Sequence, residues 1–180
     1  MRRVELELTD RAEIEEIIRD CTRMRLGLIS QGMPYILPMV FGYSWSGETP
    51  VFYLHCGMSG RKNDALTEGA RIAFEMDIEG PLTGRTPYAN GYSREFCCVM
   101  GEGTVSFARS NDEKIEYFRY IMEHQTGRSD YSYQPGWLSL TRVFRLTADK
   151  LSASRKGMKA PPPSPHPQDV MPADSETYSY

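Results

Sequence analysis

The sequence lacks the features that would assign it to a membrane, a secretory route or a nucleic acid. No apolar run approaches the roughly 20 residues that cross a bilayer. The N-terminal segment MRRVELELTD has no apolar core of the length that a secretory signal needs. The formal net charge of −3 gives no basic excess with which to neutralise phosphates. We therefore expect a cytoplasmic protein that binds neither a membrane nor a nucleic acid.

Cysteine and histidine are scarce, and their spacing is not that of a metal site. The four cysteines, Cys21, Cys56, Cys97 and Cys98, form no CxxC pair, and the three histidines are scattered. Cys97 and Cys98 fall in an expected strand, where neighbours point to opposite faces. We expect reduced thiols and no metal. The chain also lacks GxGxxG after a strand and GxxxxGK[ST], so neither dinucleotide nor P-loop binding has a motif.

The chain has enough apolar residues for one globular domain with a sizeable core, at 180 residues and 40% hydrophobic. Capping boxes at Asp10–Glu13 and Ser110–Glu113 predict two helices, and a shorter helix is expected over 59–69. Alternating or apolar runs predict about six strands, over 23–30, 34–45, 51–56, 71–78, 95–108 and 137–153. Strands in direct succession favour a closed antiparallel barrel over a parallel sheet.

Two segments differ in composition from the expected strands. Residues 79–94 contain prolines and glycines and predict a long polar loop, a type of loop that often carries function. From residue 154 the chain becomes rich in proline and poor in apolar residues. We therefore expect a domain over 1–153 and an extended or disordered tail over 154–180.

The segment Ser59-Gly60-Arg61-Lys62 places two cations where a strand is expected to lead into a helix. Cations are unfavourable at a helix N-terminus, because they face the positive end of the helix dipole. A bound phosphate would remove this conflict, and Gly60 would let the backbone approach it closely. The alternative is a pair of solvated basic residues at a turn.

His55 and Trp137 each allow two interpretations. His55 ends an apolar run, so it is either a satisfied core histidine or a group that faces a ligand and exchanges a proton near neutral pH. Trp137 opens the expected final strand, and a tryptophan there either packs against the core or covers a planar ligand. The residues alone leave both pairs of alternatives open.

The order of these elements resembles the FMN-binding split-barrel superfamily, the pyridoxamine-5′-phosphate-oxidase-like group. The resemblance rests on the opening helix and on the segments RLGLIS-QGMPYILPMVFGY, VFYLHCGMSGRKNDAL, RIAFEMD and GEGTV, in this order. Within this superfamily, the sequence motifs are most similar to those of the nitroimidazole-resistance (Nim-like) flavin-binding subgroup. The resemblance implies a mainly β fold with flanking helices, a six-stranded antiparallel split β-barrel that forms a homodimer with FMN at the interface.

The resemblance also implies the residues of the site. Arg61 and Lys62 match the phosphate-binding pair, the backbone of 38–41 runs along the flavin ring, and His55 is the implied catalytic residue. Trp137 and Arg142 would come from the partner subunit. The implied cofactor-binding residues are Pro38, Met39, Val40, Phe41, Leu54, His55, Gly60, Arg61, Lys62, Trp137 and Arg142.

The implied activity is that of an FMN-dependent oxidoreductase, a Nim-like reductase of small nitroaromatic or related acceptors. One alternative is a non-enzymatic flavin or haem binder on the same barrel, with His55 as an axial ligand. A second alternative is an interaction domain whose basic turn is only solvated. The loop 79–94 is longer and richer in glycine and proline than the family pattern, and the proline-rich tail has no counterpart in that pattern. No residues that recognise pyridoxal phosphate are evident.

Overall fold

The computed structural model describes residues 3–85 and 87–158, and within these ranges it contains eight strands. The strands are β1 (Glu7–Leu8), β2 (Arg23–Ser30), β3 (Met33–Val40), β4 (Gly42–Ser44), β5 (Val51–Gly57), β6 (Arg71–Thr83), β7 (Ser93–Phe107) and β8 (Thr141–Lys156). The helices are α1 (Arg11–Asp20), α2 (Lys62–Ala65), α3 (Asn111–Thr126) and α4 (Pro135–Ser139), with 3-10 turns η1 (Val4–Leu6) and η2 (Ala89–Gly91).

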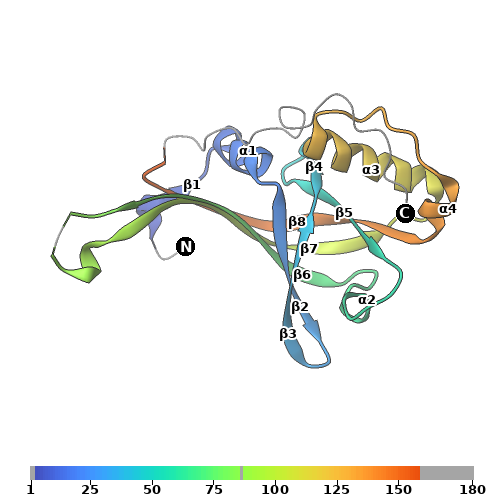
Figure 1. Ribbon diagram of the computed structural model, residues 1–180, viewed down its shortest axis with the longest axis horizontal. Helices are drawn as coiled ribbons and strands as arrows, with labels where there is room; N and C mark the ends of the chain where they lie inside the picture. The colour runs from blue at the N-terminus through green and yellow to red at the C-terminus, as the bar shows by residue number, and fades with distance from the viewer. Residues whose placement is uncertain (1–2, 86, 159–180) are drawn as a thin grey trace, which may run out of the picture.

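The strands form one antiparallel sheet in the order β3-β2-β6-β7-β8-β5-β4, and β1 pairs with β8. The sheet curls but does not close, because β3 and β4 end the order without pairing (Figure 1). The predicted mainly β antiparallel split barrel is confirmed. The count of six strands and the closed barrel are wrong. Two strands of two and three residues give no alternation that a sequence pattern can detect, and the run 34–45 divides at Phe41 into β3 and β4.

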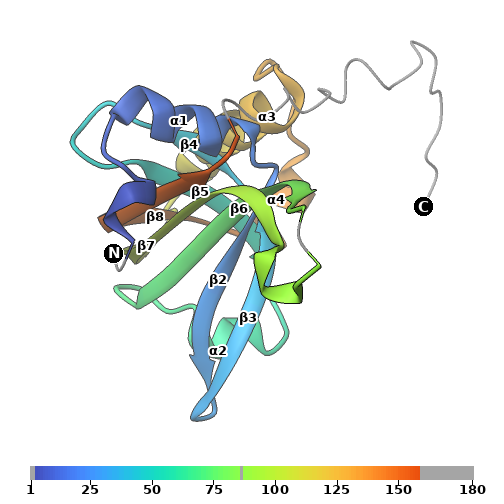
Figure 2. The same ribbon diagram turned by 90° about the vertical axis from the view of Figure 1, so that its left-hand side faces the viewer.

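Helices α1 and α3 cover the sheet on one side, as Figure 2 shows, and both begin where their capping boxes predict. The Asp10 side chain accepts from the Glu13 amide at 3.0 Å, and Ser110 Oγ accepts from the Glu113 amide at 3.2 Å. Such caps satisfy amides that a helix leaves unpaired. The core beneath α1 is built from inward-facing residues of the strands, and Phe52 and Phe144 are among those fully buried. Helix α3 packs instead on Tyr53 and Val143, in a smaller second cluster.

The segment 79–94 is not the long loop that we predicted. Strand β6 continues to Thr83 and β7 begins at Ser93, so the two strands form a hairpin arm that reaches away from the body (Figure 1). The pairing shifts register between Glu79 and Leu82, which places Pro81 in a bulge. A bulge tolerates proline, which explains why the composition misled the prediction.

Three boundaries also differ from the prediction. Helix α2 has four residues instead of eleven, and Trp137 lies in α4 rather than at the start of a strand. The predicted domain boundary at residue 153 falls inside β8, which continues to Lys156, and Met158 is still buried. Residues 159–180 of the predicted tail lie outside the described residues. Within the described ranges, no helix is long and apolar enough to cross a bilayer.

Candidate functional site

The turn between β5 and α2 presents two cations that have no carboxylate partner among the described residues. Arg61 Nε donates to Ser30 Oγ at 3.1 Å, and the guanidinium lies 4.6 Å from the centroid of the Tyr35 ring. These contacts fix Arg61 against the hairpin of β2 and β3. Lys62 Nζ donates to the Ser59 carbonyl at 3.2 Å. The two side chains therefore form a positively charged group, held in place and open to an anion.

The backbone of this turn requires glycine at one position. Gly60 has a φ of +104°, a region that side chains with a Cβ adopt only with strain. Helix α2 begins at Lys62, and no side chain caps its N-terminus. A helix of four residues has a small dipole, so the cations, and not the helix, supply the field.

Residues 38–41 divide between the outer face and the core. Pro38 and Val40 are exposed on the outer face of β3, whereas Met39 packs against the core and Phe41 is fully buried. Strand β3 ends the sheet order, so one edge of its backbone has no partner strand among the described residues. Leu54 on β5 is also fully buried. The side chains of Phe41 and Leu54 therefore cannot touch a ligand, and only the backbone there could do so.

His55 points away from the core and toward α3. Its ring lies 5.0 Å from the ring of Phe118, and its Nδ1 atom is buried without a hydrogen-bond partner among the described residues. Burial lowers the pKa of His55 below its ordinary value, because a charged imidazolium is poorly solvated there. His55 contacts α3 and Arg61 contacts the β2–β3 hairpin, so within one chain the two residues face different elements.

Arg142 lies beside the basic turn, and Trp137 does not. Arg142 donates to Asn63 Oδ1 at 2.6 Å and to the Leu66 carbonyl at 3.2 Å, and its guanidinium lies 4.0 Å from the centroid of the Phe107 ring. Arg142 therefore holds α2 of its own chain in place. Trp137 is 67% exposed on α4. Its indole thus has most of its surface available for a ligand or a second copy of the chain.

The sequence did not indicate a cavity of about 740 Å³ on the outer face of the sheet. Its floor is flat because Gly27 on β2 pairs with Ala73 on β6, and a Cβ on Gly27 would lie 3.4 Å from the Cβ of Ala73. Ile36 and Met100 flank this floor. The one signal in the sequence is a small residue at position 27 of an otherwise alternating strand. Its pairing with Ala73 could not be deduced from local pattern.

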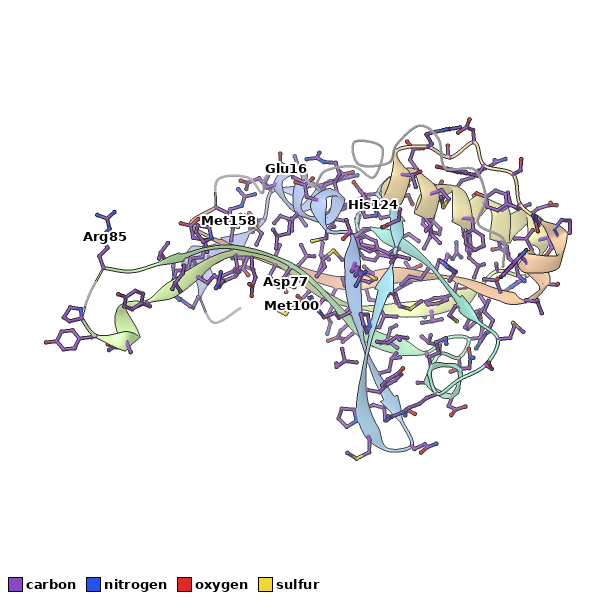
Figure 3. The ribbon with its side chains drawn as sticks, viewed as in Figure 1. Glu16, Asp77, Arg85, Met100, His124 and Met158 are labelled. Atoms are coloured by element: carbon purple, nitrogen blue, oxygen red, sulfur yellow. The ribbon has the colours of Figure 1, made fainter. Side chains whose placement is uncertain are left out.

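A charged cluster lines one side of this cavity. Arg25 Nη1 lies 2.9 Å from Glu75 Oε2 and 2.5 Å from Asp77 Oδ1, and Figure 3 shows Asp77 near Met100. Burial raises the pKa of Glu75, and the neighbouring Asp77 raises it further. Burial and the carboxylate of Glu75 raise the pKa of the Cys98 thiol to about 11. The outer face therefore combines a flat apolar floor with a compact set of charges.

The fold and these features define a class of protein, and comparison with known families names it. A family model described as pyridoxamine 5′-phosphate oxidase matches residues 10–155. The chain belongs to this family, within the flavin-binding split-barrel superfamily. No curated protein matches the chain.

Among solved structures, the chain is similar to a protein from Bacteroides thetaiotaomicron assigned to 5-nitroimidazole antibiotic resistance. The two share 26% identity over 82% of this chain and 85% of that one, with a TM-score of 0.70. The fold is shared with the flavocytochrome Anf3 from Azotobacter vinelandii. The two chains are 18% identical over 100% of this chain and 85% of that one, with a TM-score of 0.74. It is also shared with an FAD- and haem-binding protein from Mycobacterium smegmatis. These two chains are 18% identical over 91% of this chain and 78% of that one, with a TM-score of 0.72.

Proposed function

We propose that this chain is an FMN-binding oxidoreductase whose basic turn holds the phosphate of the cofactor. The observation that carries the proposal is the pair Arg61 and Lys62, which are fixed by Ser30, Tyr35 and the Ser59 carbonyl, and which have no carboxylate partner among the described residues. A phosphate with two negative charges suits such a pair, because charge-assisted hydrogen bonds to it are strong.

The neighbouring backbone fits a flavin ring as well as a phosphate. The pyrimidine edge of a flavin needs several hydrogen-bond donors and acceptors, and the free edge of β3 offers unpaired N–H and C=O groups. Pro38 and Val40 would add apolar contacts on the outer face. Residues 38–41 would thus hold the ring, and Arg61 and Lys62 would hold the phosphate.

A bound flavin would carry the redox chemistry, and the protein would supply binding and orientation. We propose a small nitroaromatic or a related acceptor as the substrate. This rests on the family pattern and on the likeness to the Bacteroides protein assigned to nitroimidazole resistance. His55 is the proposed catalytic residue. Its lowered pKa keeps the ring neutral near pH 7, and its unpartnered Nδ1 can accept or share a proton.

We also propose that the chain acts as a homodimer in the cytoplasm. The outer face carries exposed apolar side chains that a monomer has no reason to display, namely Ile29, Ile36, Val40 and Met100. They lie on β2, β3 and β7, on the same face of the sheet as the cavity. A second copy that covers this face would bring its own Trp137 or Arg142 toward the flavin of the first.

Haem binding without turnover is the second candidate, and two observations favour it. The side chain of His55 lies outside the main core, on β5 facing α3, and a histidine is a common axial ligand of haem. Two proteins with the same fold are a flavocytochrome and an FAD- and haem-binding protein. In this alternative the barrel binds a prosthetic group and reduces no small molecule.

An absorbance scan of the purified chain, followed by titration with FMN, tests the proposal. We expect flavin bands or saturable FMN uptake. The double substitution Arg61→Ala with Lys62→Ala should weaken the binding of FMN at least ~100-fold, because each charge-assisted hydrogen bond contributes about 1.5–3 kcal/mol.

The matched control is the double substitution Arg109→Ala with Arg119→Ala. It removes two exposed positive charges, one just before α3 and one within it. It should bind FMN as the unsubstituted chain does. Equal FMN affinity in both double variants would contradict the phosphate assignment. A Soret band after haem addition, with no uptake of flavin, would favour the haem alternative.

A further inference from the structure

A second cavity lies between α1, β4 and α3, and the proposed flavin site does not use it. Its volume is about 480 Å³, within the range of small-molecule sites. Three aromatic side chains line it, Tyr43, Trp45 and Tyr120, and so do two carboxylates, Glu15 from α1 and Glu123 from α3. Aromatic faces combined with carboxylates form a chemical environment that favours organic cations.

The aromatic rings are held in place by their neighbours. Tyr120 stacks on Tyr53 with centroids 4.3 Å apart and planes 8° from parallel. Tyr43 meets His124 edge to face at 5.3 Å. The guanidinium of Arg11 lies 4.9 Å from the centroid of the Trp45 ring, so this indole already attracts a cation within the chain. The rings therefore form a preorganised wall, which lowers the entropic cost of binding.

The charges that line the cavity leave negative charge available to a ligand. Glu123 makes no ion pair within the described part of the chain, and Glu15 has only Arg11 at 4.0 Å. The one arginine of the lining, Arg19, is occupied by Glu16 at 3.6 Å and by the adjacent Asp20 at 3.4 Å.

The histidine of the lining is occupied too. The ring nitrogens of His124 lie 2.8 Å and 3.0 Å from the carbonyl oxygens of Phe41 and Arg19. An anion would therefore meet carboxylates in this cavity, and among the described residues that line it no cation is without a partner.

We propose that this cavity binds a small organic ammonium ion, held by the aromatic side chains of Tyr43, Trp45 and Tyr120 and by the carboxylates of Glu15 and Glu123. The ammonium group lies against the aromatic rings and the carboxylates. This site is separate from the basic turn, which selects for the opposite charge.

Choline is a suitable probe, because it carries a quaternary ammonium group. Its neutral analogue 3,3-dimethylbutan-1-ol has the same shape without the charge. Calorimetric titration of the full chain at fixed ionic strength should show saturable binding of choline. The neutral analogue should bind at least ~10-fold more weakly, because it gains no cation–π or carboxylate attraction. Absence of saturable choline binding, or equal binding of the two probes, would overturn the proposal.

Two variants of equal charge locate the site. Glu123→Gln removes a carboxylate that lines the cavity, and Glu116→Gln removes an exposed carboxylate of the same helix that does not. We expect Glu123→Gln to weaken the binding of choline about 10-fold and Glu116→Gln to leave it unchanged. Both positions are exposed, so both variants should fold. Equal affinity in the two variants would place the cation elsewhere.

Fluorescence gives an independent readout of the same event. The chain has two tryptophans, so Trp137→Phe leaves Trp45 as the only indole. In this background choline should change the Trp45 emission with the same saturation as in calorimetry. Saturable binding without any change in Trp45 emission would contradict the assignment to this cavity.

Discussion

The inner and outer faces of the barrel wall are made by alternate residues of the same strands, yet they differ in kind. On β5, Leu54 is fully buried in the core, and its neighbour His55 turns to α3 with an unpartnered Nδ1. On β2 the inward residues Met24, Leu26 and Leu28 are apolar, and the outward ones include Arg25 and Gly27. The inner face serves stability, and so does the part of the outer face that α3 covers at Tyr53 and Val143. The uncovered part of the outer face holds charges, small residues and exposed apolar groups that folding alone does not require.

The largest expected effect is the loss of stability caused by a substitution on the inner face. Phe52 is fully buried and lies 5.7 Å from the Phe41 ring and 5.0 Å from the Phe74 ring. Phe52→Ala should lower the free energy of unfolding by about 3–5 kcal/mol, because it leaves a cavity in the core. Ile36→Ala on the outer face, where Ile36 is 61% exposed, should cost less than about 0.5 kcal/mol in dilute solution. Urea denaturation measures both, and equal losses would break the distinction between the faces.

The next effect concerns association. Ile36→Glu places a charge in the face that we propose a second copy covers. It should weaken the dimer about 100-fold, because an unpaired charge is costly to bury. Light scattering after size-exclusion chromatography measures the change. Val4→Glu, at an exposed apolar position on η1, is the matched control and should leave the dimer intact. A chain that is monomeric without any substitution would refute the proposed interface.

The smallest effect is the pH dependence that His55 contributes. Burial lowers the pKa of His55 in the folded state below its value of about 6.5 in the unfolded chain. The unfolded state therefore binds the proton first, and stability falls as the pH drops from that value through the folded pKa. In His55→Gln this loss of stability at acid pH should be smaller. Thermal unfolding measured between about pH 7.5 and 5 follows the change. His124→Gln is the comparison variant, and an unchanged acid limb in His55→Gln would argue against a buried neutral ring.

Much of the inner architecture could be predicted from local sequence. The caps at Asp10 and Ser110 and the alternation over 23–30 mark elements that the structure contains. These signals are reliable because the interactions behind them join residues within one or two turns, or within one strand. The arm of β6 and β7 was missed because Pro81 and the glycines indicate a loop unless a bulge and a partner strand accommodate them.

The candidate site could be predicted only in part, since the evidence for it in the sequence is a turn. Gly60, Arg61 and Lys62 are contiguous, so their grouping is independent of the fold. The partners of Arg61 are Ser30 and Tyr35, and the partner of Arg142 is Asn63, which lies 79 positions away. No periodicity connects residues at such separations.

By itself the sequence determined the fold class, the strands of ordinary length, the two long helices and the basic turn, because each depends on neighbours along the chain. Only the tertiary structure decided that Gly27 would lie beside Ala73, that Glu75 would meet Arg25, and that α1 and α3 would enclose an aromatic cavity. The physical reason is that strand register and helix packing are set by the burial of one shared core, to which distant segments contribute together.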